Sequence, residues 1–380
     1  MKLITTYLQA VMKGKCIYIL SPEPWGTNFV SKHHYASLLS ENNEVYFFNP
    51  PSNRNKIFDI KKGLKIVDYS LPKGINRMPR FLRVVIQSIL AKRLMQQRVL
   101  PNPDIIWSFD PYVFQDLSVF NKRATKIYHS VDVHQTDLEL FCVTNADVVF
   151  STADLILDRF KGMPTPMFQI NHGLALHFLD EDIRPVELPG DSHNIKVGYV
   201  GNLNYPFMDY ETLYKILREH CSINFYFIGP NSASNLLDKP KYLEDVERIK
   251  KLDNVFLLGA KPSSELPAYL NKMDAFLMCY RAEENIAHMA NPHKILEYLS
   301  TGKVVVTHYI DQYKDRSDLI EMVRSNVDLP SLFSKVVANV EVYNTISKVI
   351  ARKLYAQENT YTNQLSKIET ILKSINSNTD

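Results

Sequence analysis

Two hydrophobic periods alternate along the chain, and their alternation predicts an α/β fold. A strand-like apolar run at 16–22 is followed by a helical pattern through Leu39 and by a second strand-like run at 45–49. A strand, a helix and a second strand in this order are typical of the opening of a doubly wound sheet. We therefore expect a parallel sheet flanked by helices.

The alternation continues to about residue 180, stops, and starts again at residue 195. Further strands are predicted at 104–110, from Lys126, at 147–152 and 167–170, and then from Ile195 and at 223–228, 255–258, 275–279 and 304–306. Residues 181–194 are rich in Asp, Glu, Pro and Gly and are predicted to link two domains, 1–180 and 195–345. Two Rossmann-like halves with a cleft between them are the expected architecture. The chain from about Leu329 onward is expected to be helical.

Composition describes an ordinary globular protein. The chain has 380 residues, of which 45% are hydrophobic and 22% charged, so it is long enough for two cores. A net charge of +3 is too small to indicate a nucleic-acid partner. Four scattered cysteines show no metal spacing and no disulfide framework, which favours a reducing cytoplasm. The first fifteen residues are too broken for a secretory signal, and no window is apolar enough to predict a membrane-spanning helix.

The most informative stretch runs from Asn291 to Thr307 and reads as a helix followed by a buried strand. Asn291 is expected to cap the helix, Pro292 to occupy its first turn and Gly302 to end it. Lys294 and Glu297 are three residues apart and share one helical face. A lysine near a helix N-terminus suits a diphosphate, and a carboxylate one turn further along suits ribose hydroxyls.

A second interpretation of the same pair is an exposed ion pair of little consequence, which is the usual case for an arbitrary helix. The position of this pair favours the functional interpretation. It precedes a buried strand, and open α/β sheets place ligands in such turns. Gly201 follows the strand that begins at Ile195, where a glycine allows close approach of a ligand, and Asn202 is placed to point into the cleft.

The first half offers weaker candidates. Trp25, Gly26 and Thr27 follow the first strand and are candidates for contact with an acceptor substrate; a turn with a buried tryptophan explains them equally well. His129 and Asp132 lie at a strand end, where a histidine is a natural base near neutral pH, although a structural role is the commoner one. Their spacing fits no common metal motif.

A basic segment lies between residues 54 and 100. Within it, residues 77–98 combine a helical apolar pattern with arginines and lysines. Such a helix is able to lie on an anionic membrane surface, although more often it packs on its sheet with its charges in water. Both interpretations stay open at this point.

Three motifs together resemble bacterial glycosyltransferases of the B fold. They are Val-Gly-Tyr-Val-Gly-Asn-Leu at 197–203, Pro-x-Lys-x-x-Glu-Tyr-Leu-x-x-Gly-Lys-x-Val-Val at 292–306, and Ala-x-Glu-Asn-Thr-Tyr at 356–361. Asn171-His172-Gly173 through Phe178 is similar to the run that precedes the linker in that family. The likeness is greatest to the retaining family-four type and to the teichuronic-acid and capsule transferases near it.

The resemblance implies a GT-B fold in which the second domain binds a nucleotide diphosphate sugar and the first an acceptor. Lys294 would then meet the diphosphate and Glu297 the ribose, with Gly201, Asn202, Asn291 and Arg281 also near the donor. In inverting relatives a carboxylate of the first domain removes the acceptor proton, which makes Asp132 the candidate base, with His129 beside it. Helices at 346–380 would pack back on the first domain. Neither a metal nor a cofactor is implied.

Two departures from the family pattern concern the donor site. Met289 stands where many family-four members carry a second glutamate, which leaves Glu283 and Glu284 as possible substitutes. The arginine and lysine that usually follow the Val-Gly strand are absent from 202–208. Lys294 and Arg281 are the cations left to meet the diphosphate.

The prediction is a cytoplasmic glycosyltransferase that transfers a sugar, most simply from a UDP-sugar, to a glycan or lipid-linked acceptor in surface polysaccharide synthesis. Such an enzyme would work at the inner face of the membrane. A sugar-nucleotide epimerase on the same scaffold is one alternative. A degenerate transferase retained as a partner subunit is another.

Overall fold

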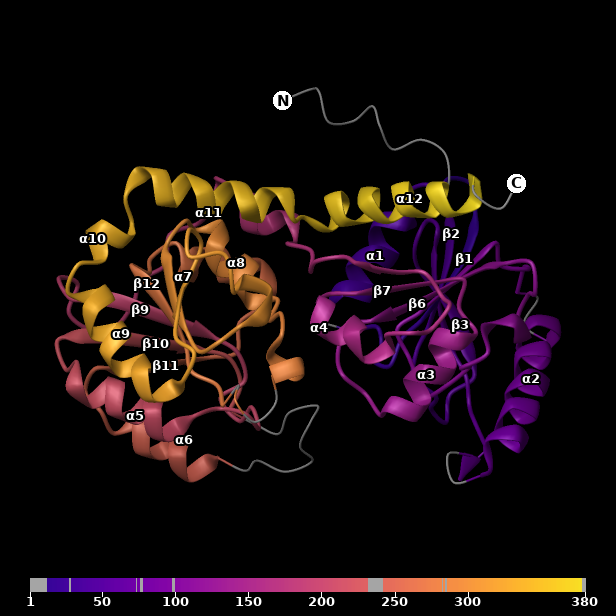
Figure 1. Cartoon of the computed structure of the whole chain (residues 1–380), viewed down its shortest axis with the longest axis horizontal. Helices are drawn as coiled ribbons and strands as arrows, with labels where there is room; N and C mark the ends of the chain where they lie inside the picture. Colours follow the sequence, from indigo (N-terminus) through magenta and orange to yellow (C-terminus); the bar gives the residue numbers. More distant parts are fainter. Residues whose placement is uncertain are drawn as a thin grey trace. The chain divides into compact units, whose positions relative to one another are not determined.

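The protein is described by a computed structural model, which covers residues 12–26, 29–72, 74–75, 78–97, 100–231, 242–281, 283 and 286–377. Two compact units make up the chain. The first comprises Met1–Asn171 together with Tyr361–Asp380, and the second comprises His172–Thr360. Each unit contains a sheet flanked by helices, so the predicted architecture of two Rossmann-like halves is confirmed (Figure 1).

The sheet of the first unit has eight strands in the order β3-β4-β2-β1-β5-β6-β7-β8. Its strands are β1 (Cys16–Leu20), β2 (Glu44–Phe48), β3 (Lys56–Lys61), β4 (Leu64–Asp68), β5 (Ile105–Ser108), β6 (Thr125–Ser130), β7 (Val148–Ser151) and β8 (Met167–Gln169). All neighbouring strands pair in parallel except β3 and β4. The sheet changes direction between β1 and β5, because the chain builds outward from β1 on one side and then returns to its other side.

The antiparallel hairpin β3–β4 lies where the sequence shows a basic segment. Gly63 makes its turn with a φ of +79°, and a Cβ at this position would lie 2.2 Å from the carbonyl oxygen of Ser40. Glycine is therefore required there by both backbone conformation and space. The many lysines of this hairpin hid the period-two pattern that marks a strand.

Helices cover both faces of this sheet. Along β5, Trp107 packs in a core with α1 (Ser31–Leu39) and α12 (Tyr361–Ser377), whereas Ile106 packs in a second core with α2 (Arg80–Gln97). Alternate residues of a strand point to opposite faces, which explains this division. The shorter α3 (Thr136–Thr144) and α4 (Asp154–Leu157) flank β6 and β7. The apolar side of α12 is buried through Leu365, Ile368 and Leu372.

The sheet of the second unit has six strands in the order β11-β10-β9-β12-β13-β14, all in parallel. They are β9 (Ile195–Val200), β10 (Ile223–Ile228), β11 (Val255–Gly259), β12 (Ala275–Met278), β13 (Val304–Thr307) and β14 (Glu321–Met322). Its helices are α5 (Tyr210–Glu219), α6 (Leu243–Lys250), α7 (Leu266–Leu270), α8 (Lys294–Ser300), α9 (Leu329–Val337), α10 (Val340–Tyr343) and α11 (Ile346–Glu358). This sheet changes direction between β9 and β12.

The boundaries between the units differ from the predicted ones. Leu174 and Phe178 belong to the core of the second unit, so the chain enters that unit before residue 180 and before the predicted linker at 181–194. Of the helices at 346–380, α12 alone belongs to the first unit. The α11 helix packs on α8. The buried guanidinium of Arg352 in α11 donates to the carbonyl oxygens of Gly302, Leu319 and Tyr343, which ties α11 to the second unit.

Candidate functional site

The carboxyl ends of β9 and β10 bring two glycines together. Gly201 and Gly229 have φ values of +156° and +152°, and a Cβ on Gly229 would lie 2.0 Å from the carbonyl oxygen of Gly201. A Cβ on Gly201 would lie 2.9 Å from Cε of Lys294. The lysine side chain therefore extends over bare backbone at the point where the sheet changes direction, which is where open α/β sheets bind ligands.

The helix that carries this lysine starts later than predicted. α8 begins at Lys294, its N-cap is His293 in a helical conformation, and no side chain caps it. The prediction that Asn291 is the cap is wrong. The amides of Ile295 and Leu296 already bond to the carbonyl oxygens of Pro292 and His293, so the first turn needs no side-chain acceptor from Asn291.

The end of α8 follows the prediction. Gly302 has a φ of +78°, its amide donates to the carbonyl oxygen of Leu299, and a Cβ there would lie 2.6 Å from Val349. Left-handed backbone of this kind is the usual end of a helix and favours glycine. The following run Val304 to Val306 is fully buried in β13.

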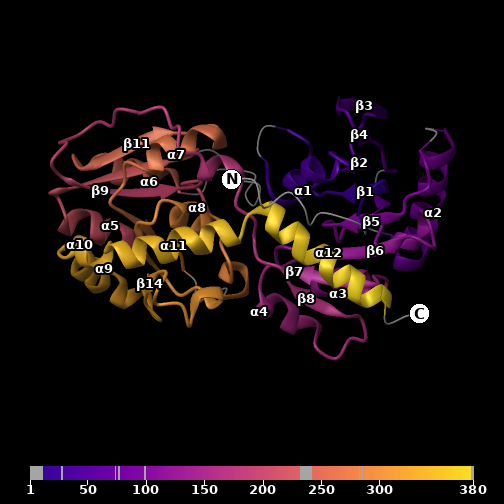
Figure 2. The same cartoon turned by 90° about the horizontal axis from the view of Figure 1, so that it is seen from above.

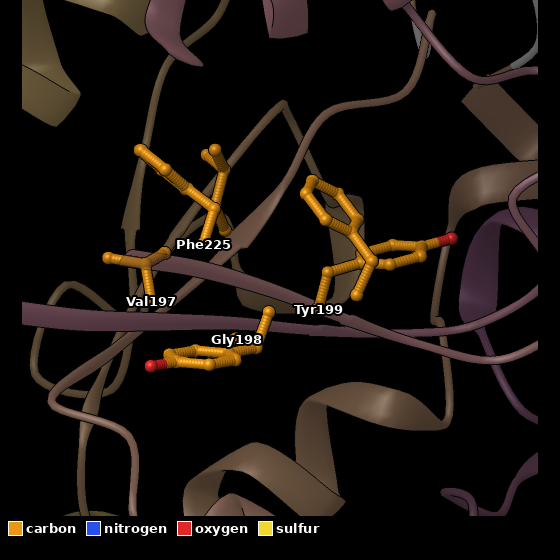
Figure 3. Close-up of a pocket in the computed structure, with 7 residues that line it drawn as sticks. Val197, Gly198, Tyr199 and Phe225 are labelled. Atoms are coloured by element: carbon orange, nitrogen blue, oxygen red, sulfur yellow. The ribbon is translucent and has the colours of Figure 1, made fainter. Parts of the chain in front are cut away.

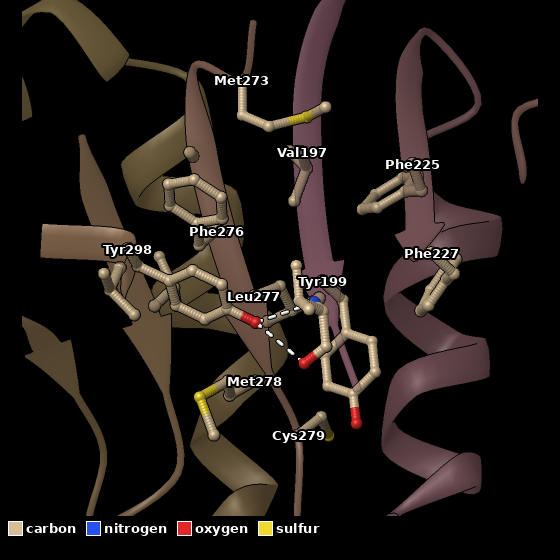
Figure 4. Close-up of a cluster of buried hydrophobic side chains, with 14 of the residues drawn as sticks. Val197, Tyr199, Phe225, Phe227, Met273, Phe276, Leu277, Met278, Cys279 and Tyr298 are labelled. Carbon is tan, nitrogen blue, oxygen red and sulfur yellow. Dashed lines mark hydrogen bonds between the residues drawn. The ribbon is translucent and has the colours of Figure 1, made fainter. Parts of the chain in front are cut away.

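Tyr298 ties α8 to the end of β9. Its hydroxyl accepts a hydrogen bond from the amide of Val200 at 2.8 Å and donates to the carbonyl oxygen of the same residue at 3.3 Å (Figure 4). Its ring stacks on Phe276, with centroids 4.2 Å apart and planes inclined by 5°. This double anchor fixes the turn of helix that bears Lys294 and Glu297 relative to Gly201. The sequence contains Tyr298 within a motif but does not reveal this role.

Glu297 lies one turn after Lys294 in a mostly buried position. Burial raises the pKa of its carboxyl group to about 7, against the opposing effect of the Lys294 charge. Nε2 of His293 lies 3.9 Å from its carboxylate, and the ring of His172 lies 5.9 Å from that of His293. His172 of the Asn171-His172-Gly173 motif thus lies near His293 at the start of α8, and neither histidine was a candidate from the sequence. The sequence signal for these histidines is their place inside motifs: His172 lies between Asn171 and Gly173, and His293 lies between Pro292 and Lys294.

Two further predicted donor residues have protein partners. The Asn202 side chain accepts a hydrogen bond from the amide of Asn204 at 2.8 Å and so closes a local turn. The guanidinium group of Arg281 donates to the carbonyl oxygen of Pro206 at 2.9 Å and to the hydroxyl of Tyr242 at 2.7 Å. The structure therefore brings Gly201, Lys294 and Glu297 together, while it uses Asn202 and Arg281 to shape the loop after β9.

Of the two possible substitutes for the second glutamate, the structure describes Glu283. Glu283 accepts a hydrogen bond from the amide of Asn326 at 3.2 Å, at the start of a short 3₁₀ turn. Glu284 lies outside the described residues. Met289 is buried, and its sulfur accepts a hydrogen bond from the hydroxyl of Tyr205 at 3.8 Å.

The cavity drawn in Figure 3 lies inside the second unit's sheet and is lined by residues of β9, β10 and β12. Its volume is about 10 Å³, which is room for one water molecule at most. Gly198 lines this cavity, but the space beside the glycine is filled, since a Cβ there would lie 2.8 Å from Met273. This gap is a packing feature and cannot hold a nucleotide.

In the first unit, His129 lies within strand β6, whereas Asp132 lies in the loop after it. His129 is 2% exposed and stacks with Trp107 and Phe109 in the aromatic core, at centroid distances of 5.9 and 5.0 Å. Asp132 is exposed in the loop that follows the strand. His129 was predicted as a catalytic residue beside Asp132, but its ring lies in the aromatic core and not in the loop that carries Asp132.

The loop that carries Asp132 is held by a buried carboxylate that sequence reasoning missed. Glu139 accepts hydrogen bonds from the hydroxyls of Tyr128 and Ser130 and from the amide of His134, at 2.7–3.0 Å. Arg159 pairs with it at 2.7 Å. A lone glutamate in a helical pattern offers no sequence signal for such a network.

A second missed group lies where the first sheet changes direction. Asp110 follows β5 and is buried, and burial raises the pKa of its carboxyl group to about 6 despite hydrogen bonds from backbone amides. Lys32 and Glu23 form an ion pair close enough to influence its charge. The residues are far apart in sequence, and the order of the strands brings them together.

Of the predicted acceptor residues, Trp25 and Gly26 are described, whereas Thr27 lies outside the described residues. The amide of Trp25 donates to the side chain of Asn49 at 2.7 Å, and its ring packs edge-on against Phe47. Gly26 is exposed. Trp25 is thus part of the packing of this loop.

Comparison with known proteins gives a match to one family within the second unit. Residues 194–327 match the family glycosyl transferases group 1. No curated protein sequence matches the chain. The structure is similar to sucrose-phosphate synthase from Thermosynechococcus elongatus, with a TM-score of 0.73, 13% identity and coverage of 96% of this chain and 99% of that one.

Two other solved structures show the same likeness. α,α-Trehalose 6-phosphate synthase from Burkholderia multivorans has a TM-score of 0.69 and 10% identity over 97% of this chain and 98% of its own. Anabaena HepE in complex with UDP and glucose has a TM-score of 0.65 and 12% identity over 95% of this chain and 100% of its own. The chain therefore has the GT-B fold, and residues 194–327 of its second unit are similar to the group 1 glycosyl transferases.

Proposed function

We propose that this protein transfers a sugar from a nucleotide diphosphate sugar, most simply a UDP-sugar, to a glycan or lipid-linked acceptor. The observation that carries this proposal is the position of Lys294 over the backbone of Gly201, with Glu297 one turn further along the same helix. A cation beside open backbone suits a diphosphate, and a carboxylate suits the two hydroxyls of ribose. The Anabaena protein, which has the same fold, was solved with UDP and glucose.

Transfer of the sugar leaves negative charge on the diphosphate, so a fixed cation there lowers the barrier. In this proposal Lys294 supplies that charge, and Tyr298 keeps the lysine in place. Asn291, Asn202 and Arg281 are predicted to complete the donor site, Arg281 by shaping the loop after β9.

The acceptor is assigned to the first unit, near Trp25, Gly26 and Thr27. If the reaction inverts the sugar, a carboxylate must remove the acceptor proton. Asp132 is the predicted base, and Asp110 is a second candidate because its raised pKa of about 6 suits a proton acceptor near neutral pH. In a retaining reaction the departing diphosphate takes the proton.

The test is calorimetric titration of the unmodified chain and of Lys294→Ala with UDP. We expect Lys294→Ala to lose at least about 1.5 kcal/mol of binding free energy, the low end for a hydrogen bond to a charged group. Lys272→Ala is the matched control, because Lys272 is exposed just before β12, at the other end of the sheet. Equal affinities for all three proteins would favour a degenerate transferase kept as a partner subunit.

Product analysis separates the transferase from the alternative epimerase. An epimerase converts the donor when no acceptor is present, whereas a transferase needs an acceptor for turnover. A screen of nucleotide sugars for protection against thermal unfolding identifies the donor, since a bound ligand raises stability with its concentration. We place the reaction in surface polysaccharide synthesis in the cytoplasm, on the likeness of the motifs to teichuronic-acid and capsule transferases.

A further inference from the structure

Helix α2 exposes a stripe of large apolar side chains. Phe81, Val85 and Ile89 are 69%, 54% and 47% exposed, and their spacing of four residues places them on one face of the helix. On the opposite side, Ala91 and Leu94 are buried in the core of the first unit. The helix is thus apolar on its packed side and on its free side, and Figures 1 and 2 show it at the margin of this unit.

The charged residues of α2 and of the chain on either side of it are all basic. No Asp or Glu occurs between Asp68 and Asp104, whereas the same stretch contains seven basic residues: Lys73, Arg77, Arg80, Arg83, Lys92, Arg93 and Arg98. Lys92 and Arg93 are exposed one turn beyond Ile89. Lys73, Arg77 and Arg98 lie outside the described residues, so the charge they add is known from the sequence alone.

We propose that α2 docks on the anionic surface of a lipid bilayer, with Phe81, Val85 and Ile89 inserted between the headgroups. An apolar stripe next to basic side chains is the arrangement that binds an anionic interface. A second copy of the chain fits this face poorly, because a twofold contact places the same basic helix opposite itself. No helix among the described residues is long and apolar enough to cross a membrane.

A second apolar stripe provides an internal comparison. Ile350 and Leu354 of α11 are 50% and 51% exposed, close to the values for Val85 and Ile89. The charges on and beside α11 are mixed, with Lys353 and Glu358 both exposed. Apolar exposure is therefore similar on the two helices, whereas the charged residues of α2 itself are all basic.

The experiment measures co-sedimentation of the full chain with vesicles, without nucleotide or acceptor, so its outcome does not depend on the proposed activity. Vesicles of phosphatidylcholine are compared with vesicles of phosphatidylcholine and phosphatidylglycerol. The variants are Phe81→Ser with Val85→Ser, Lys92→Gln with Arg93→Gln, and the control Ile350→Ser with Leu354→Ser. All six side chains are at the surface, and circular dichroism verifies that each variant is folded.

We expect the unmodified chain to bind the phosphatidylglycerol vesicles, and more weakly in high salt because salt screens the charges. Each double substitution in α2 is expected to lower the partition coefficient about tenfold, while the α11 control retains it. Three results would each overturn the proposal: no binding to the anionic vesicles, equal binding by the α2 variants, or concentration-dependent dimers that disappear in Phe81→Ser with Val85→Ser. The last would identify a second copy as the occupant.

Discussion

Replacement of Tyr298 by phenylalanine tests whether the anchor between α8 and β9 positions the donor site. Tyr298→Phe keeps the ring that stacks on Phe276 and removes one hydroxyl group. That hydroxyl serves both the amide and the carbonyl oxygen of Val200, which is buried. A buried amide left without an acceptor costs about 1–3 kcal/mol. The substitution should therefore destabilise the second unit by that amount.

For a unit of this size, about 1 kcal/mol lowers the melting temperature by about 2–4 °C. Thermal unfolding should thus show a decrease of several degrees. The second expected effect concerns binding: once the anchor is lost, Lys294 is no longer held over Gly201, and UDP affinity measured by calorimetry should decrease as well.

Tyr226→Phe provides the matched control. The hydroxyl of Tyr226 donates to the carbonyl oxygen of Pro189 at 2.7 Å, in the same unit but away from the strand ends near Lys294. This variant should lose stability and keep its affinity for UDP. If Tyr298→Phe behaves in the same way, with reduced stability and unchanged affinity, then the anchor does not position the lysine and the reasoning fails.

Two further predictions concern charge. A ribose contact requires the ionised form of Glu297, whose pKa is raised to about 7, so the affinity for UDP-glucose measured by calorimetry should rise with pH through 7. In Glu297→Gln the affinity should not change with pH. A variant whose affinity rises with pH as steeply as that of the unmodified chain would contradict this role. The raised pKa also means that the folded state holds the proton more tightly than the unfolded state, so this group lowers the free energy of unfolding as pH rises from 4.5 to above 7. Arg159→Ala should destabilise the first unit by about 3 kcal/mol, seen in urea unfolding, because it leaves Glu139 buried without its cation. Arg123→Ala, at an exposed site, is the control, and equal midpoints would refute the prediction.

The sequence predicts the strands well where both faces are buried. Runs such as Val304 to Val306 contain only apolar residues, so a single pattern reveals them. Gly201 marks the end of a strand, and Gly302 marks the end of the helix α8. The hairpin β3–β4 was not predicted, because its alternation is obscured by lysines that extend into solvent.

The candidate site was predicted in part, for a physical reason. Lys294 and Glu297 are close in sequence, and helical spacing places them on one face. The anchor formed by Tyr298 joins residues 98 apart in the sequence, and Lys32, 78 residues before Asp110, lies near enough to influence the charge of that carboxyl group. Contacts of this kind depend on the order of the strands in the sheet, which the hydrophobic pattern of the sequence does not specify. The prediction for His129 did not take into account which face of the sheet its side chain points to, and in the structure that side chain lies in the core.

The division of the chain has a consequence for biosynthesis. The second unit is made from one uninterrupted segment, His172–Thr360, whereas the core of the first unit is completed by Ile368 and Leu372 of α12. During translation the second unit can therefore fold before the first unit does. The first unit cannot complete its core, and keeps part of its apolar surface exposed to solvent, until α12 has left the ribosome.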